Sequence, residues 1–357
     1  MPRATVARID LDALKFNYHL AQAKAGSTQA MAVVKADGYG HGIQAVAKAL
    51  ANDARKFAVA CLEEAFAIRA AGLHQPVVML QGVHRPEDLE LCFQQGFEPV
   101  LHNSQQLQWL AASSAPLYWL KVNTGMNRLG FRPSELPAVM AKLEEGGQRA
   151  ELQGFVTHFA CADDTSSPMT AEQTRIFEQA TQAWPKLMRS VGNSAAHFLP
   201  EQPLYDWSRP GIMLYGASPM IGKTGSDLGL KPVMTLEAPL ITTRTVKPGE
   251  SIGYGSTWVA ESETRMGMVA IGYGDGYPRH AGTGTPAAVL GQRIGLLGRV
   301  SMDMLAVDLT GVPEAQEGDM VELWGKTVSV DEVAACAGTI GYELLTGVTA
   351  RVPRDCY

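Results

Sequence analysis

The sequence contains few cysteines and no closely spaced pair of them. Five are scattered over 357 residues, at Cys61, Cys92, Cys161, Cys336 and Cys356. An odd number without a CxxC pair argues against a disulfide framework and against a cysteine-bound metal. We therefore expect reduced thiols, a cytoplasmic location and no metal site.

Long apolar runs and basic clusters are also lacking. The N-terminus turns polar within a few residues, so it has no signal-peptide core, and no apolar run is long enough to span a membrane. Thirty Lys and Arg residues against 36 Asp and Glu give a formal net charge of −6, without a basic run. We expect a soluble protein that binds neither nucleic acid nor a membrane.

The length and the apolar pattern point to two domains, the first of them a barrel. After a short strand-like start at residues 5–9, eight apolar runs alternate with segments of helical spacing such as 62–71 and 170–186. Alternating strands and helices of this number predict an α/β fold, a (β/α)8 TIM barrel. The eight predicted strands are residues 30–35, 56–61, 76–80, 97–101, 117–122, 152–158, 189–193 and 212–215.

The pattern changes near Lys231. Six strand-like segments follow, and only residues 330–337 have clear helical spacing. This predicts a barrel over residues 1–230 and a mostly β C-terminal domain over 231–357, joined by the Gly- and Pro-rich segment 219–229. The first strand, about residues 1–9, is a candidate to pack with the second domain. The six strand-like segments are residues 233–246, 266–272, 287–290, 293–296, 301–309 and 320–324.

Lys35 closes the first predicted barrel strand, within the segment AVVKADGYGHG at residues 32–42. Active sites of such barrels lie where the strands end. Partial burial disfavours the ammonium form, so this amine is suited to form a Schiff base with an aldehyde cofactor. Tyr39, four residues on, could contact a phosphate. A lysine that simply points into solvent is the ordinary alternative for a strand end.

The segment V-K-A-D-G-Y-G-H-G resembles the cofactor-attachment motif of alanine racemases, and the resemblance runs from about Ala7 to Tyr342 in matching order. It implies a fold-type III pyridoxal phosphate enzyme, an isomerase built from a barrel and a β domain. It also implies that Lys35 carries the pyridoxal phosphate.

Lys121 and Arg128 lie in LKVNTGMNRLG, at the end of the fifth predicted strand. The planar guanidinium of an arginine suits a carboxylate. The resemblance implies that Arg128 contacts the substrate carboxylate or the cofactor phenolate, and that Lys121 is carbamylated. A surface salt bridge is the alternative for Arg128.

His158 ends the sixth predicted strand, in GFVTHFACADD. A single histidine is often a core residue, but the strand end favours a place in the cofactor network. The motif departs from the family at Cys161, where an arginine is usual. Arg209, in DWSRPGI, resembles the residue that faces the pyridine nitrogen, where a cation disfavours protonation. An ion pair with Asp206 is the alternative.

Loops after the last two strands of a barrel commonly bind phosphate through backbone N–H groups and hydroxyls. The segments GNSAA and DWSRPGI occupy these places, and the latter enters the predicted eighth strand. The resemblance implies a phosphate site at this end of the barrel, and a helix N-cap is a compatible role for its serine. The residues concerned are Asn193, Ser194, Gly211, Ile212 and Tyr342.

The second domain contains Tyr-Gly clusters that by composition indicate turns. Their order resembles the racemase pattern, in which the tyrosine matching Tyr254 reaches the active site of the other subunit. The same applies to the residues matching Tyr273, Met302 and Asp303. The resemblance therefore implies a homodimer with shared sites.

The resemblance implies racemisation of L- and D-alanine, and our hypothesis is a mechanism with two bases, Lys35 for one face of Cα and Tyr254 for the other. The product would serve peptidoglycan synthesis, or the enzyme would allow D-alanine breakdown. The alternatives are a broad-specificity amino-acid racemase, an amino-acid decarboxylase of related architecture, and a non-catalytic pyridoxal phosphate carrier. A barrel enzyme with another cofactor remains the least specific alternative.

Overall fold

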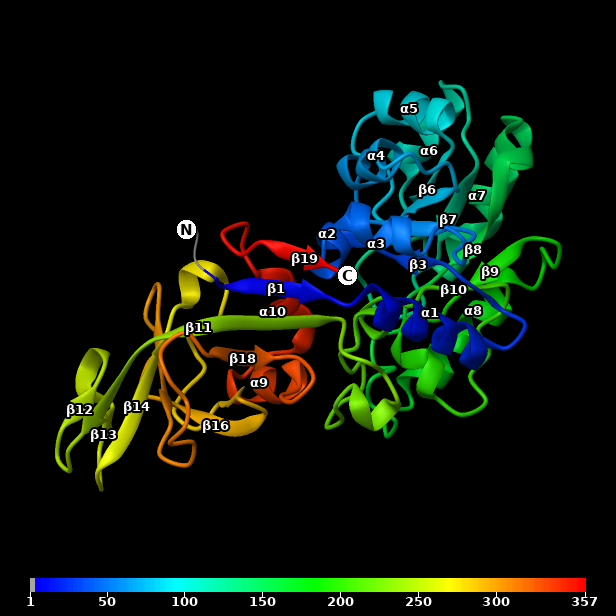
Figure 1. The fold of residues 1–357 in the computed structure, drawn as a ribbon. Coiled ribbons are helices and arrows are strands. Elements are labelled where there is room, and N and C mark those ends of the chain that lie inside the picture. The colour runs from blue at the N-terminus through cyan, green and yellow to red at the C-terminus, as the bar shows by residue number, and fades with distance from the viewer. Residues whose placement is uncertain (1–3) are drawn as a thin grey trace.

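The computed structural model describes residues 4–357, and its first large unit is a barrel of parallel strands (Figure 1). Two short strands lie on either side of Met31 and together serve as the first barrel strand. Residues 29–30 pair with the last strand of the barrel, and residues 32–33 pair with the second. The ring of eight strands therefore closes, which confirms the predicted barrel. The strands are β2 (Gln29–Ala30) with β3 (Ala32–Val33), β4 (Phe57–Val59), β5 (Val77–Met79), β6 (Phe97–Leu101), β7 (Tyr118–Lys121), β8 (Leu152–Val156), β9 (Met188–Ser190) and β10 (Trp207–Ser208).

Helices connect the strands and cover the outside of the barrel. Capping side chains begin two of them: Asp10 accepts a hydrogen bond from the N–H of Ala13, and Asn103 accepts one from that of Gln106. Each bond satisfies one of the N–H groups that a helix leaves free at its start. The helices are α1 (Leu11–Ala25), α3 (Ile43–Ala49), α4 (Leu62–Ala70), α5 (Glu87–Gln95), α6 (Ser104–Ala111), α7 (Leu136–Glu145) and α8 (Met169–Thr181).

The predicted eighth strand was wrong. Residues 212–215 form a 3-10 turn, η4 (Ile212–Tyr215), and the eighth strand is the two-residue β10 that precedes them. All four residues of the turn are buried, and a short buried apolar run looks the same in sequence whether it is strand or helix. Arg209, Gly211 and Ile212 therefore follow the eighth strand instead of entering it.

The second unit is an antiparallel β structure. Its long strand β11 (Met234–Val246) pairs with β14 (Thr264–Val269) and β18 (Met320–Trp324), and the N-terminal strand β1 (Val6–Ile9) pairs with β11 and with β19 (Arg354–Cys356). Its other elements are β12 (Ser251–Ile252), β13 (Trp258–Val259), β15 (Pro286–Val289), β16 (Gln292–Leu297), β17 (Leu305–Asp308), α9 (Val330–Cys336) and α10 (Gly341–Gly347). Figure 1 shows β12 and β13 at the end of this unit farthest from the barrel.

Helix α10 connects this β unit to the barrel mouth. Gly40 packs so closely on it that a Cβ atom at Gly40 would lie 2.1 Å from the carbonyl oxygen of Leu345. The guanidinium of Arg354 adds a second link, since it donates to the carbonyl of Gly40 and to three carbonyls of residues 348–352. Within residues 4–357, no helix is long and apolar enough to cross a membrane.

Candidate active site

A cavity of about 1110 Å³ opens at the carboxyl ends of the barrel strands. This is the face on which enzymes of this fold carry their chemistry. Eleven of the predicted site residues line it. They are Lys35, Tyr39, Lys121, Arg128, His158, Asn193, Ser194, Arg209, Gly211, Ile212 and Tyr342.

Lys35 begins a left-handed turn at the wall of the cavity. The next four residues, Ala36, Asp37, Gly38 and Tyr39, have φ angles of 52°, 54°, 62° and 53°. A left-handed conformation costs a non-glycine residue about 1–2 kcal/mol, so three of these four residues are strained. Side-chain bonds offset part of this strain, because Glu64 accepts from the N–H of Ala36 at 2.6 Å and Asp37 accepts from the N–H of Ile43 at 2.8 Å.

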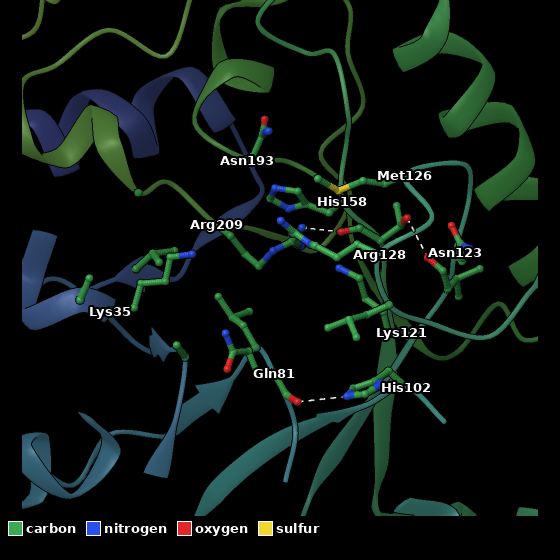
Figure 2. Close-up of a pocket in the computed structure, with 18 of the residues that line it drawn as sticks. Lys35, Gln81, His102, Lys121, Asn123, Met126, Arg128, His158, Asn193 and Arg209 are labelled. Atoms are coloured by element: carbon green, nitrogen blue, oxygen red, sulfur yellow. Dashed lines mark hydrogen bonds between the residues drawn. The ribbon is translucent and has the colours of Figure 1, made fainter. Parts of the chain in front are cut away.

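Five basic side chains converge in the cavity. Lys121, Arg128, His158 and Arg209 form a group, and Lys35 extends toward them from the opposite wall (Figure 2). Among residues 4–357, none of the five lies in an ion pair with a carboxylate. Basic groups without ion-pair partners repel one another when charged, so the arrangement is suited to an anionic ligand.

Burial and mutual repulsion lower the pKa values of these groups. Burial lowers the pKa of Lys35, and Arg128 adds to the effect. The pKa of Lys121 falls well below its usual value through burial and through the charges of Arg209 and Arg128, and the pKa of His158 falls in the same way. The site therefore favours neutral amines and a neutral imidazole, which can act as bases or nucleophiles.

Arg209 is held by hydrogen bonds at the wall of the cavity. It is buried and donates to the carbonyl of Thr157 at 2.5 Å, to the carbonyl of Val191 at 3.3 Å and to the hydroxyl of Ser190. The alternative ion pair with Asp206 is absent from the described ion pairs, and that carboxylate accepts from the N–H of Arg189 instead. Burial lowers the pKa of Arg209 to about 10, which still leaves a cation at neutral pH.

Ser194, Gly211 and Ile212 form a cradle of hydrogen-bonding groups at one end of the cavity. The hydroxyl of Ser194 accepts from the N–H of Gly211 at 2.8 Å, and Ile212 begins a 3-10 turn whose first N–H groups have no partner inside it. The Tyr39 hydroxyl lies against Gly211, where a Cβ atom would be 2.4 Å from it. Only glycine leaves room for this hydroxyl.

Asn193 and Tyr342 complete the cradle from two sides. The carbonyl of Asn193 accepts from Nδ1 of His197 at 2.9 Å, which fixes the loop after β9. Helix α10 of the β unit carries Tyr342, whose ring centre lies 6.1 Å from that of Tyr39. The cavity is therefore built by both units of the chain.

Four predicted site residues lie outside this cavity. The side chain of Tyr254 is 71 % exposed, between β12 and β13 at the far end of the β unit (Figure 1). Tyr273, Met302 and Asp303 form a second exposed group, in which the N–H of Gly274 donates to the carbonyl of Met302. One copy of the chain does not bring these four residues to Lys35.

The cavity also contains polar residues that the sequence prediction missed. Gln81, His102 and Asn123 line it, and Nε2 of His102 donates to the carbonyl of Gln81 at 3.1 Å (Figure 2). Each of these residues directly follows or closely follows a barrel strand. Their positions at strand ends were the available signal, since that is where barrel sites are built.

The closed parallel barrel, the strand-end lysine and the cluster of basic side chains define a barrel enzyme for anionic ligands. The family model described as alanine racemase, N-terminal domain, matches residues 9–219, and that for the C-terminal domain matches residues 233–356. The chain belongs to the alanine racemase family.

Individual relatives agree with this assignment over the whole chain. The chain is 74 % identical over 354 residues to an alanine racemase of Marinobacter nauticus, covering 99 % of each protein. The solved biosynthetic alanine racemase of Pseudomonas aeruginosa superposes with a TM-score of 0.95 at 47 % identity, covering 100 % of both chains. A Bartonella henselae alanine racemase, solved with covalently bound pyridoxal phosphate, gives a TM-score of 0.89 at 30 % identity, again covering 100 % of both chains.

Proposed function

We propose that this protein racemises alanine with pyridoxal phosphate, in active sites shared by two copies of the chain. The single observation that carries the proposal is the position of Lys35. This half-buried amine lies at the mouth of the barrel, its pKa is lowered, and it faces four further basic groups. An aldehyde cofactor with a phosphate, and a substrate with a carboxylate, would satisfy this combination of groups.

The residues of the cavity fit pyridoxal phosphate in their chemistry. Lys35 supplies the amine for the aldehyde, and Arg209 supplies a fixed cation for the pyridine nitrogen. The phosphate would be held by Ser194, the N–H groups of Gly211 and Ile212, and the hydroxyls of Tyr39 and Tyr342, with Asn193 beside them. When bound, the cofactor supplies an electron-accepting ring that acidifies the α proton of an attached amino acid.

Lys35 is the base that we assign to the face of Cα used for the D form. Its lowered pKa keeps a larger fraction of the amine neutral near pH 7 than in an exposed lysine, so it can take a proton there. Arg128 binds the substrate carboxylate or the cofactor phenolate. His158 lies beside Arg209 as part of the network around the cofactor ring.

Tyr254 is the base that we assign to the opposite face, and a second copy of the chain must supply it. Its side chain is exposed between β12 and β13, and Tyr273, Met302 and Asp303 form a second exposed group on the same unit. Exposed aromatic and methionine side chains are enriched at protein interfaces. A homodimer that seats this surface on the barrel mouth of its partner would complete both sites.

Lys121 is the proposed site of carbamylation. Its pKa lies well below the usual lysine value, so the neutral amine that reacts with carbon dioxide is available. The neutral amine attacks carbon dioxide, forms an N–C bond and releases one proton, so the neutral side chain becomes an anion. That anion would face Arg128 and Arg209 and offset their repulsion.

The first experiment is to incubate the purified protein with L-alanine in deuterated water. Loss of optical rotation with deuterium at Cα, together with an absorbance band near 420 nm, an approximate property of the lysine-bound cofactor, would support the proposal. Exchange of many amino acids at similar rates would indicate a broad-specificity racemase. A band without exchange would indicate a carrier, or a decarboxylase if carbon dioxide is released. No band after addition of pyridoxal phosphate would contradict the proposal.

Tyr254→Phe separates the two bases. In this variant the rate of α-proton removal from L-alanine should fall roughly 100-fold or more, which is the usual contribution of a general base. Deuterium exchange into D-alanine through Lys35 should remain measurable. Tyr357→Phe is the matched control, because Tyr357 is also exposed and lies outside the proposed site. Unchanged racemisation in both directions by Tyr254→Phe would contradict the assigned role.

A further inference from the structure

His41 lies at the end of the motif that begins with Lys35, and neither the cavity nor the proposed chemistry uses it. Its side chain is fully buried. Nδ1 lies 2.8 Å from the carbonyl oxygen of Tyr39 and 3.0 Å from that of Gly38. Carbonyl oxygens only accept hydrogen bonds, so Nδ1 must carry the proton and donate to both.

The other ring nitrogen of His41 fixes the protonation state. Within residues 4–357, Nε2 is buried and has no hydrogen-bond partner. A second proton there would place a charge in a buried position without a partner, and burial indeed lowers the pKa of His41 to about 4. The ring is therefore a neutral donor at physiological pH, with its single N–H directed at the strained turn.

The two carbonyls that His41 holds belong to the left-handed residues themselves. Tyr39 has a φ angle of 53°, and this conformation turns its ring toward the phosphate cradle. The ring of Tyr215 stacks on that of Tyr39 at 4.7 Å, and the ring of His41 lies 4.7 Å from Tyr215. His41 thus contacts Tyr39 twice, through its carbonyl and through the intervening ring.

We propose that His41 is a positioning residue for the cofactor phosphate. Its Nδ1–H holds the left-handed backbone of Tyr39, which keeps the Tyr39 hydroxyl at Gly211 in the phosphate cradle. The inference rests on the proposed function, since it requires that pyridoxal phosphate binds here. A residue that merely filled space in the core would not need a donor at this atom.

Two amide variants test the donor atom itself. In His41→Asn the side-chain nitrogen takes the place of Nδ1, whereas in His41→Gln it extends to the place of Nε2. The measurement is the Kd of the full-length chain, stripped of cofactor, for pyridoxal phosphate and for pyridoxal, which lacks the phosphate. His41→Gln should bind pyridoxal phosphate roughly 10- to 100-fold more weakly, the effect of unpaired buried carbonyls. Its affinity for pyridoxal should change little, and His41→Asn should keep both affinities.

Tyr39→Phe completes the test. This variant should show the same selective loss for the phosphate form, and adding His41→Gln to it should cause no further loss, because both changes act through one hydroxyl. Equal losses for pyridoxal and pyridoxal phosphate, or a phosphate-selective loss in His41→Asn, would overturn the inference. If His41→Gln does not fold, His41→Asn and Tyr39→Phe still decide it. A wild-type chain that binds neither compound would instead contradict the proposed function.

Discussion

Lys56 and Glu98 form an ion pair across the inside of the barrel. The ammonium nitrogen of Lys56 lies 2.5 Å and 2.7 Å from the two carboxylate oxygens of Glu98, and both side chains are buried. Lys56 directly precedes β4 and Glu98 lies in β6, with β5 between these strands. The indole N–H of Trp119 also donates to Glu98 at 2.8 Å, so the carboxylate is well satisfied.

Removing one member of this pair should destabilise the barrel without changing the site. Glu98→Gln leaves the Lys56 charge buried without a counter-charge, which typically costs about 3–5 kcal/mol. The double variant Lys56→Met with Glu98→Leu should recover most of this loss, because it removes both charges. Urea unfolding followed by tryptophan fluorescence measures the effect. A Glu98→Gln variant as stable as the wild type would show that the pair contributes nothing.

The pair also illustrates what sequence alone could provide. Barrel strands were predictable because short apolar runs alternate with helical segments, and seven of the eleven cavity residues lie at or after the end of such a run. Arg209, Gly211 and Ile212 instead precede or begin the run 212–215, which forms a 3-10 turn. Glu98 gave no such signal, because its partner lies 42 residues away and only the alignment of β4, β5 and β6 in the sheet brings them together. Tyr342 was assigned by resemblance alone, since its place depends on how α10 packs against Gly40.

The pH dependence of cofactor attachment should report the environment of Lys35. Burial, and secondly the charge of Arg128, lower the pKa of this amine. Arg128→Gln removes a neighbouring cation, so the pKa of Lys35 should rise and attachment should need a higher pH. Borohydride trapping of pyridoxal phosphate on the protein at a series of pH values measures this. Arg132→Gln, on the same loop but outside the cavity, should leave the pH profile of attachment unchanged. If the profile of Arg128→Gln did not move to higher pH, the electrostatic effect of Arg128 would be excluded.

Acid should weaken the fold partly through His197. Burial lowers its pKa from 6.5 to about 4, so the unfolded chain takes up a proton at higher pH than the folded chain. The free energy of unfolding should therefore fall as the pH drops from 6.5 to 4, by about 3 kcal/mol for this group, and level off below. His197→Asn keeps a nitrogen near the carbonyl of Asn193 but cannot titrate. Urea unfolding from pH 4 to 7 gives the slope of the free energy of unfolding against pH. In His197→Asn this slope should be lower than in the wild type by the equivalent of about one proton. An unchanged slope would contradict the lowered pKa of His197.

Pairing of two inactive chains tests whether the active site is shared. Lys35→Ala and Tyr254→Phe each alter one of the two proposed bases, so each homodimer has a defect in both sites. In a heterodimer with shared sites, both defects fall in one site, and the other combines an intact Lys35 with an intact Tyr254. Heterodimers purified through two different affinity tags should therefore recover about half of the wild-type activity.

The opposite result would be equally informative. If each chain built its own site, one site of the heterodimer would lack Lys35 and the other Tyr254, and activity would stay at the level of the two homodimers. The exposed position of Tyr254 at the far end of the β unit makes that outcome incompatible with its proposed role as a base. A heterodimer of Tyr254→Phe with wild type controls for assembly and tagging, because it should retain one intact site.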